Sequence, residues 1–306
     1  MKTKLLVEQH IHGAFGVDFN KASIEEVIFV SKELLKHGIG GYFPTLVTDS
    51  IENIKRQIQI IKTASSKLQA DAAEILGIHL EAIFINTEKK GIHNHEHFLP
   101  LTVENYQLIE DEFIKIVTLA PELDEGLLEY LASKNIKVQA GHCVGADLTY
   151  CEGVTHLFNA MQPISHRGGS TALSAMIDDR IYTEIIADGV HLSDDILKLI
   201  FKSKPCNRII LISDALPITY SSKKAIEFAD EKIYYDGVKA TSINGTIAGS
   251  TTLLDKIVKI LGEKDLFTVQ LINNVYDYHN ISLDGEIEWD DNLNIVSIRK
   301  GDYYAK

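Results

Sequence analysis

GVTHLFNAMQPISHRGG, from Gly153 to Gly169, opens as a short apolar strand and places His156 where that strand would end. Asn159 and Arg167 follow in a segment too irregular to be a helix. A histidine at a strand end can bind a metal ion and an arginine can bind an anion, but a lone histidine in an apolar strand is more often a core residue. The remaining strands therefore decide how this stretch is interpreted.

The composition is that of a folded globular protein. The 306 residues are 45% hydrophobic and 24% charged, which suits a large core and not a disordered chain. This length fits one α/β barrel with a small appendage, and equally two average domains. The net charge of -13 disfavours non-specific binding to nucleic acid or to an anionic membrane. An anionic ligand would need a local basic pocket.

The cysteines and the apolar segments indicate the compartment. Cys143, Cys151 and Cys206 form no CxxC pair and are too few for a disulfide framework, so we expect free thiols. No apolar run is long enough to cross a membrane, and we see no secretory signal pattern. We therefore expect a cytoplasmic protein with no membrane partner and no nucleic acid partner.

Short apolar segments alternate with segments of helical spacing. The expected strands are residues 5–12, 40–45, 74–81, 114–119, 136–142, 154–158, 183–187 and 208–212. The clearest helices are expected at 23–36, 51–61, 124–133, 170–178 and 193–202. Eight repeats of strand and helix close most simply into a (β/α)8 barrel of the α/β class. A doubly wound open sheet is the alternative, but no G-x-G-x-x-G follows the first strand.

The pattern changes after the eighth strand. Residues 231–247 contain an Asp236-Gly237 turn between strand-like runs, 250–261 is helical, and 285–299 resembles a closing hairpin. The only visible partners of this hairpin are itself and the short strands near Tyr234. We therefore expect a barrel, residues 1–275, and a short β appendage, residues 276–306, that packs on it.

Potential metal ligands collect at the expected strand ends, where barrel enzymes carry their chemistry. These residues are His10, His12, Glu81, His142, His156 and Asp214. Strand alternation points both histidines of the His-x-His pair to the same side. Accidental placement would not gather these residues at one face, so a metal site is favoured. Imidazole and carboxylate ligands suit zinc or iron better than magnesium, but do not distinguish zinc from iron.

Several short motifs follow one another along the chain. The most specific are VTLAPE (117–122) and THLFNAM (155–161); the others are HIHG (10–13), GIHLE (77–81), GH (141–142), HRGG (166–169), ADGVH (187–191), SDA (213–215) and AGST (248–251). Their order resembles that of the N-acetylglucosamine-6-phosphate deacetylases of the amidohydrolase superfamily. The resemblance covers residue 8 to about 260. It implies a metal-dependent enzyme that acts, as a homodimer, on a small-molecule amino-sugar phosphate.

The resemblance also implies a metal site for one or two ions per subunit. Glu81, His142 and His156 match the ligands that every family member keeps. His10 and His12, with Asp214, match the ligands of a second ion in some members, and Glu81 would then bridge the two ions. Asp214 also matches the catalytic acid and base of the family.

Further positions match residues that contact the substrate in the family. Asn159, Ala160 and Arg167 match the sugar-phosphate site, His191 matches a substrate-contacting histidine, and His93 matches the lid histidine that orients the substrate. The guanidinium of an arginine holds a phosphate with more geometric selectivity than lysine does. Taken alone, Arg167 could equally form a surface salt bridge.

The expected reaction hydrolyses the acetamide of N-acetyl-D-glucosamine 6-phosphate to glucosamine 6-phosphate and acetate. A metal-bound water has a pKa lowered towards neutrality, so it can act as the nucleophile. Asp214 can take the proton of this water and return it to the leaving amine.

Two features depart from the family pattern. Ala82 and Ile83 follow Glu81 where the family usually has Gly-Pro, which motivates an alternative amidohydrolase function on another N-acyl amino sugar or a cyclic amide. The family normally carries several tens of residues before the first strand, which form a small β-sandwich with the carboxyl-terminal strands. We therefore expect the sandwich to be missing or reduced.

An alternative from a different functional class is a catalytically silent module that binds a sugar phosphate. The intact Asp214 argues against this alternative.

Overall fold

The structure is a computed structural model that describes residues 1–145 and 147–306. Eight parallel strands at its centre pair in chain order. They are β2 (Leu6–Ile11), β5 (Ile39–Val47), β7 (Ile78–Glu81), β8 (Ile114–Leu119), β9 (Lys137–Ala140), β10 (Gly153–Val154), β11 (Tyr182–Ile185) and β12 (Ile209–Leu211). A sequential strand order is that of a barrel and differs from the order of a doubly wound sheet.

The first and last strands meet at their carboxyl ends. Ile11 forms a parallel bridge with Ala215, just beyond β12, and the amide of Asp214 donates to the carbonyl of His10 at 2.9 Å. The nearly closed (β/α)8 barrel expected from the sequence is therefore confirmed, and the open sheet is not formed.

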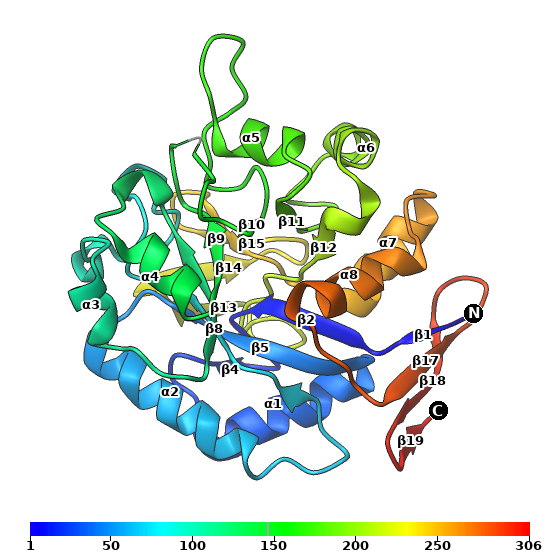
Figure 1. Ribbon diagram of the computed structural model, residues 1–306. Helices are drawn as coiled ribbons and strands as arrows, with labels where there is room; N and C mark the ends of the chain where they lie inside the picture. The colour runs from blue at the N-terminus through cyan, green and yellow to red at the C-terminus, as the bar shows by residue number, and fades with distance from the viewer. Residues whose placement is uncertain (146) are drawn as a thin grey trace.

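Helices cover the outside of the barrel (Figure 1). They are α1 (Ile24–Lys36), α2 (Ile51–Ser65), α3 (Val103–Gln107), α4 (Leu127–Ser133), α5 (Thr171–Ile177), α6 (Asp194–Ser203), α7 (Leu254–Glu263) and α8 (Val269–His279). The side chains of Ser23 and Glu26 form the capping box that begins α1. Eight strict repeats were a wrong expectation, because the described residues between β9 and β10 contain no helix.

Helix α8, which the sequence patterns did not predict, packs against β2 and β12. Its Tyr276 hydroxyl donates to the carbonyl of Leu5 at 2.7 Å. The helix therefore covers the junction at which β2 and β12 form no continuous ladder. The expected boundary at residue 275 falls inside α8, and the division into two domains stays a prediction.

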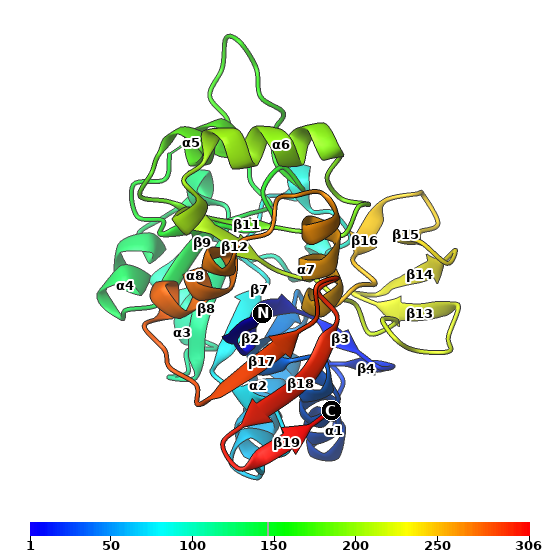
Figure 2. The same cartoon turned by 90° about the vertical axis from the view of Figure 1, so that its right-hand side faces the viewer.

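Two small antiparallel sheets of four strands each flank the barrel (Figure 2). One follows β12 and contains β13 (Ala225–Phe228), β14 (Glu231–Tyr235), β15 (Ala240–Ser242) and β16 (Ile247–Gly249). The other contains β1 (Lys2–Lys4), β17 (Gly285–Trp289), β18 (Ile295–Lys300) and β19 (Tyr303–Ala305). The remaining short strands are β3 (Gly13–Ala14), β4 (Val17–Asp18) and β6 (Glu74–Ile75). The reduced β part is thereby confirmed.

The hairpin of β17 and β18 is also confirmed, but the expected pairing with strands near Tyr234 was wrong. β17 pairs with β1 instead, and the indole nitrogen of Trp289 donates to the Thr3 hydroxyl at 2.8 Å. A pairing between segments more than 280 residues apart leaves no local signal in the sequence.

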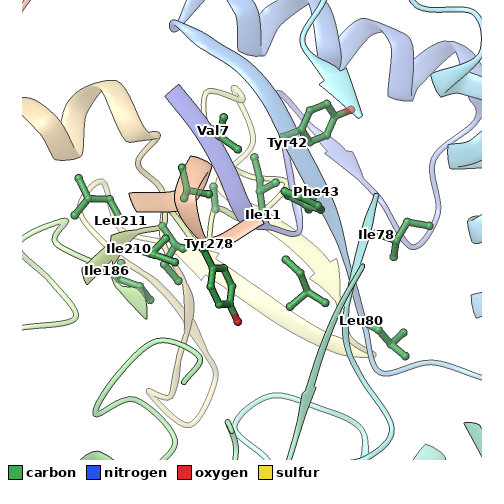
Figure 3. Packing of buried hydrophobic residues seen from close by; sticks show 14 of the residues in the cluster. Val7, Ile11, Tyr42, Phe43, Ile78, Leu80, Ile186, Ile210, Leu211 and Tyr278 are labelled. Carbon is green, nitrogen blue, oxygen red and sulfur yellow. The ribbon is translucent and has the colours of Figure 1, made fainter. Parts of the chain in front are cut away.

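The buried residues are of two kinds. Apolar side chains such as Val7, Ile11, Phe43 and Leu80 pack around the strands (Figure 3). A second, polar set is also at most 1% exposed: Glu8, Gln9, His79, Thr118, Gln139, Thr155, Thr183 and Glu184. Most of this set is hydrogen-bonded internally: Gln9 bonds Glu184, and His79, Thr118, Thr155 and Gln139 form a chain of bonds. The Thr183 hydroxyl has no partner among the described residues. All three cysteines are free thiols, as expected. Within the described residues, no helix has the length and apolar character needed to cross a membrane.

Candidate active site

A cavity lies at the carboxyl ends of the barrel strands. Its lining includes nearly all the residues expected from the sequence: His12, Glu81, His93, His142, His156, Asn159, Ala160, His191 and Asp214. His10 lies directly behind this wall, with its side chain fully buried. Arg167 is not among the lining residues.

Glu81, the last residue of β7, lies at the centre of the site. Its Oε1 is 2.9 Å from Nε2 of His156 and 3.3 Å from Nε2 of His142. Its Oε2 is 3.2 Å from Nε2 of His10 and 3.0 Å from Nε2 of His12. One carboxylate therefore faces two pairs of imidazoles, one pair at each oxygen.

Asp214 follows β12 and faces the His-x-His pair. Its Oδ1 lies 3.3 Å from Nε2 of His12 and 3.5 Å from Nε2 of His10. Asp214, His142 and His156 all adopt positive φ angles, of 52°, 49° and 31°. Such left-handed conformations cost free energy outside glycine and tend to occur at functional sites. Here they turn the chain directly after a strand, so that each side chain enters the cavity.

The electrostatics of the site favour a cation between the carboxylates and imidazoles. Burial alone would raise the pKa of Glu81, but the surrounding imidazoles, His10 foremost, hold that pKa well below its usual range. Burial opposes protonation of His12, yet Asp214 and Glu81 raise its pKa to about 9. Negative charge shared among close imidazole nitrogens also attracts a metal ion, which would compete with these protons.

The donor atoms fit a divalent metal. His10, His12 and Asp214 form one group with ligand atoms within 4.8 Å of one another, and Glu81, His93 and His142 form another. The second ring nitrogen of His142 hydrogen-bonds the carbonyl of Lys89 at 2.7 Å, which requires a proton on Nδ1 and leaves Nε2 free to bind. Buried imidazoles and carboxylates in this arrangement suit zinc or iron.

Two further histidines line the cavity. Nδ1 of His93 lies 2.8 Å from the Thr48 hydroxyl, and burial, together with His142, lowers the pKa of His93 well below its usual range. His93 is therefore neutral. Nδ1 of His191 lies 2.9 Å from Asp188, which orients the ring. Asn159 donates its side-chain amide to the carbonyl of His156 at 3.2 Å and so holds the turn that carries His156.

Arg167 lies on an exposed loop, residues 162–169, between β10 and α5. This loop projects from the body of the molecule (Figure 1). In the described part of the chain, the Arg167 side chain has no hydrogen-bond or ion-pair partner, and only its amide donates, to the Ser165 hydroxyl. The expected arrangement, a metal ligand beside an anion-binding arginine, is therefore not found within one chain. His156 and Arg167 are close in the sequence, but the loop that carries Arg167 turns away from the cavity.

Comparison with known proteins identifies the family. No family model matches the chain. It is 31% identical over 278 residues to the N-acetylglucosamine-6-phosphate deacetylase of Bos taurus, which covers 83% of this chain and 67% of that protein. With the protein of the same name from Bacillus subtilis (strain 168), it is 31% identical over 259 residues, covering 80% and 65%.

This chain belongs to the N-acetylglucosamine-6-phosphate deacetylase family. The family resemblance carried by the motifs is therefore confirmed. The chain spans about two thirds of the length of these curated relatives.

Solved structures of N-acetylglucosamine-6-phosphate deacetylases share the fold. The enzyme of Mycobacterium smegmatis superposes with a TM-score of 0.90 at 22% identity, covering 100% of this chain and 88% of the other. That of Thermotoga maritima gives 0.89 at 24% identity, covering 98% and 87%. The deacetylase fold thus extends over nearly the whole chain.

Some residues of this family member contact the site without having been expected there. Glu184 of β11 lies 3.2 Å from Nδ1 of His10, and His79 of β7 packs against the same ring with centroids 4.6 Å apart. The sequence signal that could have identified Glu184 was its charge, because it lies in a strand, residues 183–187, that was expected to be buried. Lys89 also lines the cavity, although sequence reasoning gave it no role.

Proposed function

We propose that this chain hydrolyses the acetamide of N-acetyl-D-glucosamine 6-phosphate to glucosamine 6-phosphate and acetate. The observation that carries the proposal is the convergence of Glu81 and Asp214 with buried imidazoles at the floor of one cavity. Membership of the deacetylase family makes acetamide hydrolysis the chemistry that this set of residues supports best.

We assign one ion to Glu81, His142 and His156, and a second to His10, His12 and Asp214, with zinc or iron as the metal. A bound divalent ion lowers the pKa of a water molecule and polarises an amide carbonyl. Glu81 can serve both positions because each of its oxygens faces a different pair of imidazoles.

Asp214 is the general base and acid of the proposed reaction. Its side chain is 10% exposed and lines the cavity, so it can reach a water molecule and the substrate amide. It takes a proton from the attacking water and passes it to the nitrogen of the leaving amine. His93, which is neutral, orients the substrate through a hydrogen bond from its cavity-facing edge.

Asn159, Ala160 and His191 bind the sugar phosphate in this proposal, since all three line the cavity. Arg167 supports phosphate binding best from a second copy of the chain, because it is exposed and lies outside its own cavity. A homodimer would supply that second copy. Free cysteines favour a reducing, cytoplasmic setting.

The alternative substrates come from the Ala82-Ile83 departure. Both residues are buried and neither lines the cavity, so they give no direct reason for a different substrate. A panel of N-acetylated sugars with and without a 6-phosphate, together with a cyclic amide, tests the proposal. We expect release of acetate from the phosphorylated sugar at the highest kcat/KM. Preferred cleavage of the cyclic amide would establish the other amidohydrolase function, and binding of the sugar phosphate without a single turnover would establish the silent module.

A further inference from the structure

Glu184 contacts ligands of both proposed ion positions. It is 1% exposed and lies inside the barrel on β11. Its Oε2 is 3.2 Å from Nδ1 of His10 and accepts a hydrogen bond from the amide of His156 at 3.2 Å. His10 and His156 belong to different ion positions, so a single buried carboxylate links the two.

The partners of Glu184 define the tautomer of His10. Its Oε1 accepts from the side-chain amide of Gln9 at 2.5 Å, and its Oε2 accepts from the His156 amide. Both oxygens therefore already accept hydrogen bonds, and Nδ1 of His10 must donate to this carboxylate. With Nδ1 bound to Glu184, Nε2 is the nitrogen that faces Glu81 and Asp214, 3.2 and 3.5 Å away, and that would bind a metal ion in place of a proton.

A second layer of contacts fixes Glu184 itself. Because Gln9 donates through its nitrogen, its oxygen faces Nε2 of His279 at 2.9 Å and accepts a hydrogen bond from it. His279 is the last residue of α8, and its ring packs against Phe43 with centroids 4.5 Å apart. A directional chain of donors thus runs from α8 through Gln9 to Glu184.

We propose that Glu184 is a positioning residue for metal binding: it holds the His10 imidazole with Nε2 directed into the site and fixes the backbone of His156. The proposal rests on the metal site proposed above. Partners of this kind orient metal-binding histidines and raise their basicity, and losing one typically weakens metal affinity 10–100-fold.

The test is a cobalt(II) titration of metal-free protein, followed by visible absorption, for the unmodified chain and for Glu184→Gln. We expect cobalt affinity to fall about 10–100-fold and the absorption spectrum to change, because the substituted amide no longer carries the charge that the His10 proton requires. An unchanged affinity and spectrum would overturn the proposal.

Glu8→Gln is the matched control. Glu8 is an equally buried carboxyl group on the chain's first barrel strand, where it accepts from the backbone amides of His10 and Ser213, at 3.1 and 3.0 Å, and contacts the Ser213 hydroxyl. Unlike Glu184, it forms no hydrogen bond with an imidazole of the described residues. Its replacement should leave the cobalt spectrum close to that of the unmodified chain. An equal loss in both variants would assign the effect to any buried carboxyl group beside the site and would overturn the positioning role.

Gln9→Met provides a second variant should Glu184→Gln not fold. It keeps the carboxylate of Glu184 and removes the Gln9 contacts, so we expect a smaller loss of cobalt affinity than in Glu184→Gln. No loss of affinity would count against the proposal.

Acetate release is measured separately on the unmodified chain. Cobalt binding that depends on Glu184 without acetate release would remove the proposed substrate and leave the positioning role intact.

Discussion

Oε1 of Glu81 lies 2.9 Å from Nε2 of His156, although 75 positions separate the two residues in the chain. Glu81 ends β7 and His156 follows β10, and two further strands lie between them in the sheet. The contact forms because the strands of a parallel barrel all end at one face. A metal site assembled from several strand ends therefore depends on the barrel as a whole.

Replacing Glu81 with glutamine should strip the site of metal. The change removes the one carboxylate that faces all four imidazoles, so we expect bound metal after dialysis to fall at least about tenfold. Elemental analysis of metal-loaded protein measures this. Glu152→Gln is the control, since Glu152 is exposed and pairs with Lys137 away from the cavity. Full metal occupancy in Glu81→Gln would show that Glu81 is no ligand.

Asp214→Asn separates proton transfer from metal binding. The amide keeps the shape of the side chain but cannot take a proton, so we expect kcat to fall about 10²–10⁴-fold while the ion assigned to Glu81, His142 and His156 is retained. Steady-state kinetics and metal analysis on the same sample provide the measurement. Loss of metal together with activity would instead make Asp214 chiefly a ligand.

Arg167→Met tests whether a second copy completes the phosphate site. We expect KM for the phosphorylated sugar to rise about tenfold or more, because a charge-assisted bidentate contact is lost. Arg180→Met, at an exposed arginine paired with Asp178, should leave KM unchanged.

Mixing Arg167→Met with Asp214→Asn sharpens this test. In a mixed dimer, one cavity would combine an intact Asp214 with an intact Arg167 from the other chain. Activity above that of either variant alone is expected. No gain on mixing, with subunit exchange verified, would show that Arg167 does not act across an interface.

The sequence predicts those site residues that come directly after strands. Alternation points His10, in β2, and His12, just after it, to the same side, and an apolar run ending in Glu81 marks the end of β7. Such local patterns suffice because parallel strands bring their carboxyl ends together. The direction of the Arg167 loop has no comparable signal, since Gly168, Gly169 and their polar neighbours permit many paths.

Residues of the barrel interior were harder to predict. In the short strand YTEI, Glu184 resembles the solvent-facing position of an alternating strand, and its partners Gln9 and His10 lie near the start of the sequence. Helix α8 was missed because its buried face includes Asn274, Tyr276 and Tyr278, which interrupt an apolar stripe. In both cases the polar side chains of Glu184, Asn274 and Tyr276 find hydrogen-bond partners far away in the sequence.

Asp18→Asn should change how stability depends on pH. The Asp18 side chain is 11% exposed, and burial raises its pKa to about 6 from an ordinary value of 3.8. The folded state thus binds the proton more tightly, so Asp18 lowers stability as pH rises from about 4 to about 6, and the loss persists above that range.

Urea unfolding of metal-free protein at pH 4 and pH 7 measures this effect. Relative to the unmodified chain, the Asp18→Asn variant should gain about 1–3 kcal/mol of stability between the two pH values. Asp302→Asn, at an exposed aspartate, should show no such gain. Parallel pH profiles for the Asp18 variant and the unmodified chain would contradict a raised pKa.

The most direct measurement is acetate release from N-acetyl-D-glucosamine 6-phosphate by the chain loaded with zinc or iron, compared with the same protein after chelation. We predict steady release of acetate, matched by glucosamine 6-phosphate, that stops on chelation and returns when the metal is restored. No acetate above the chelated control with either metal would contradict the proposed deacetylase function.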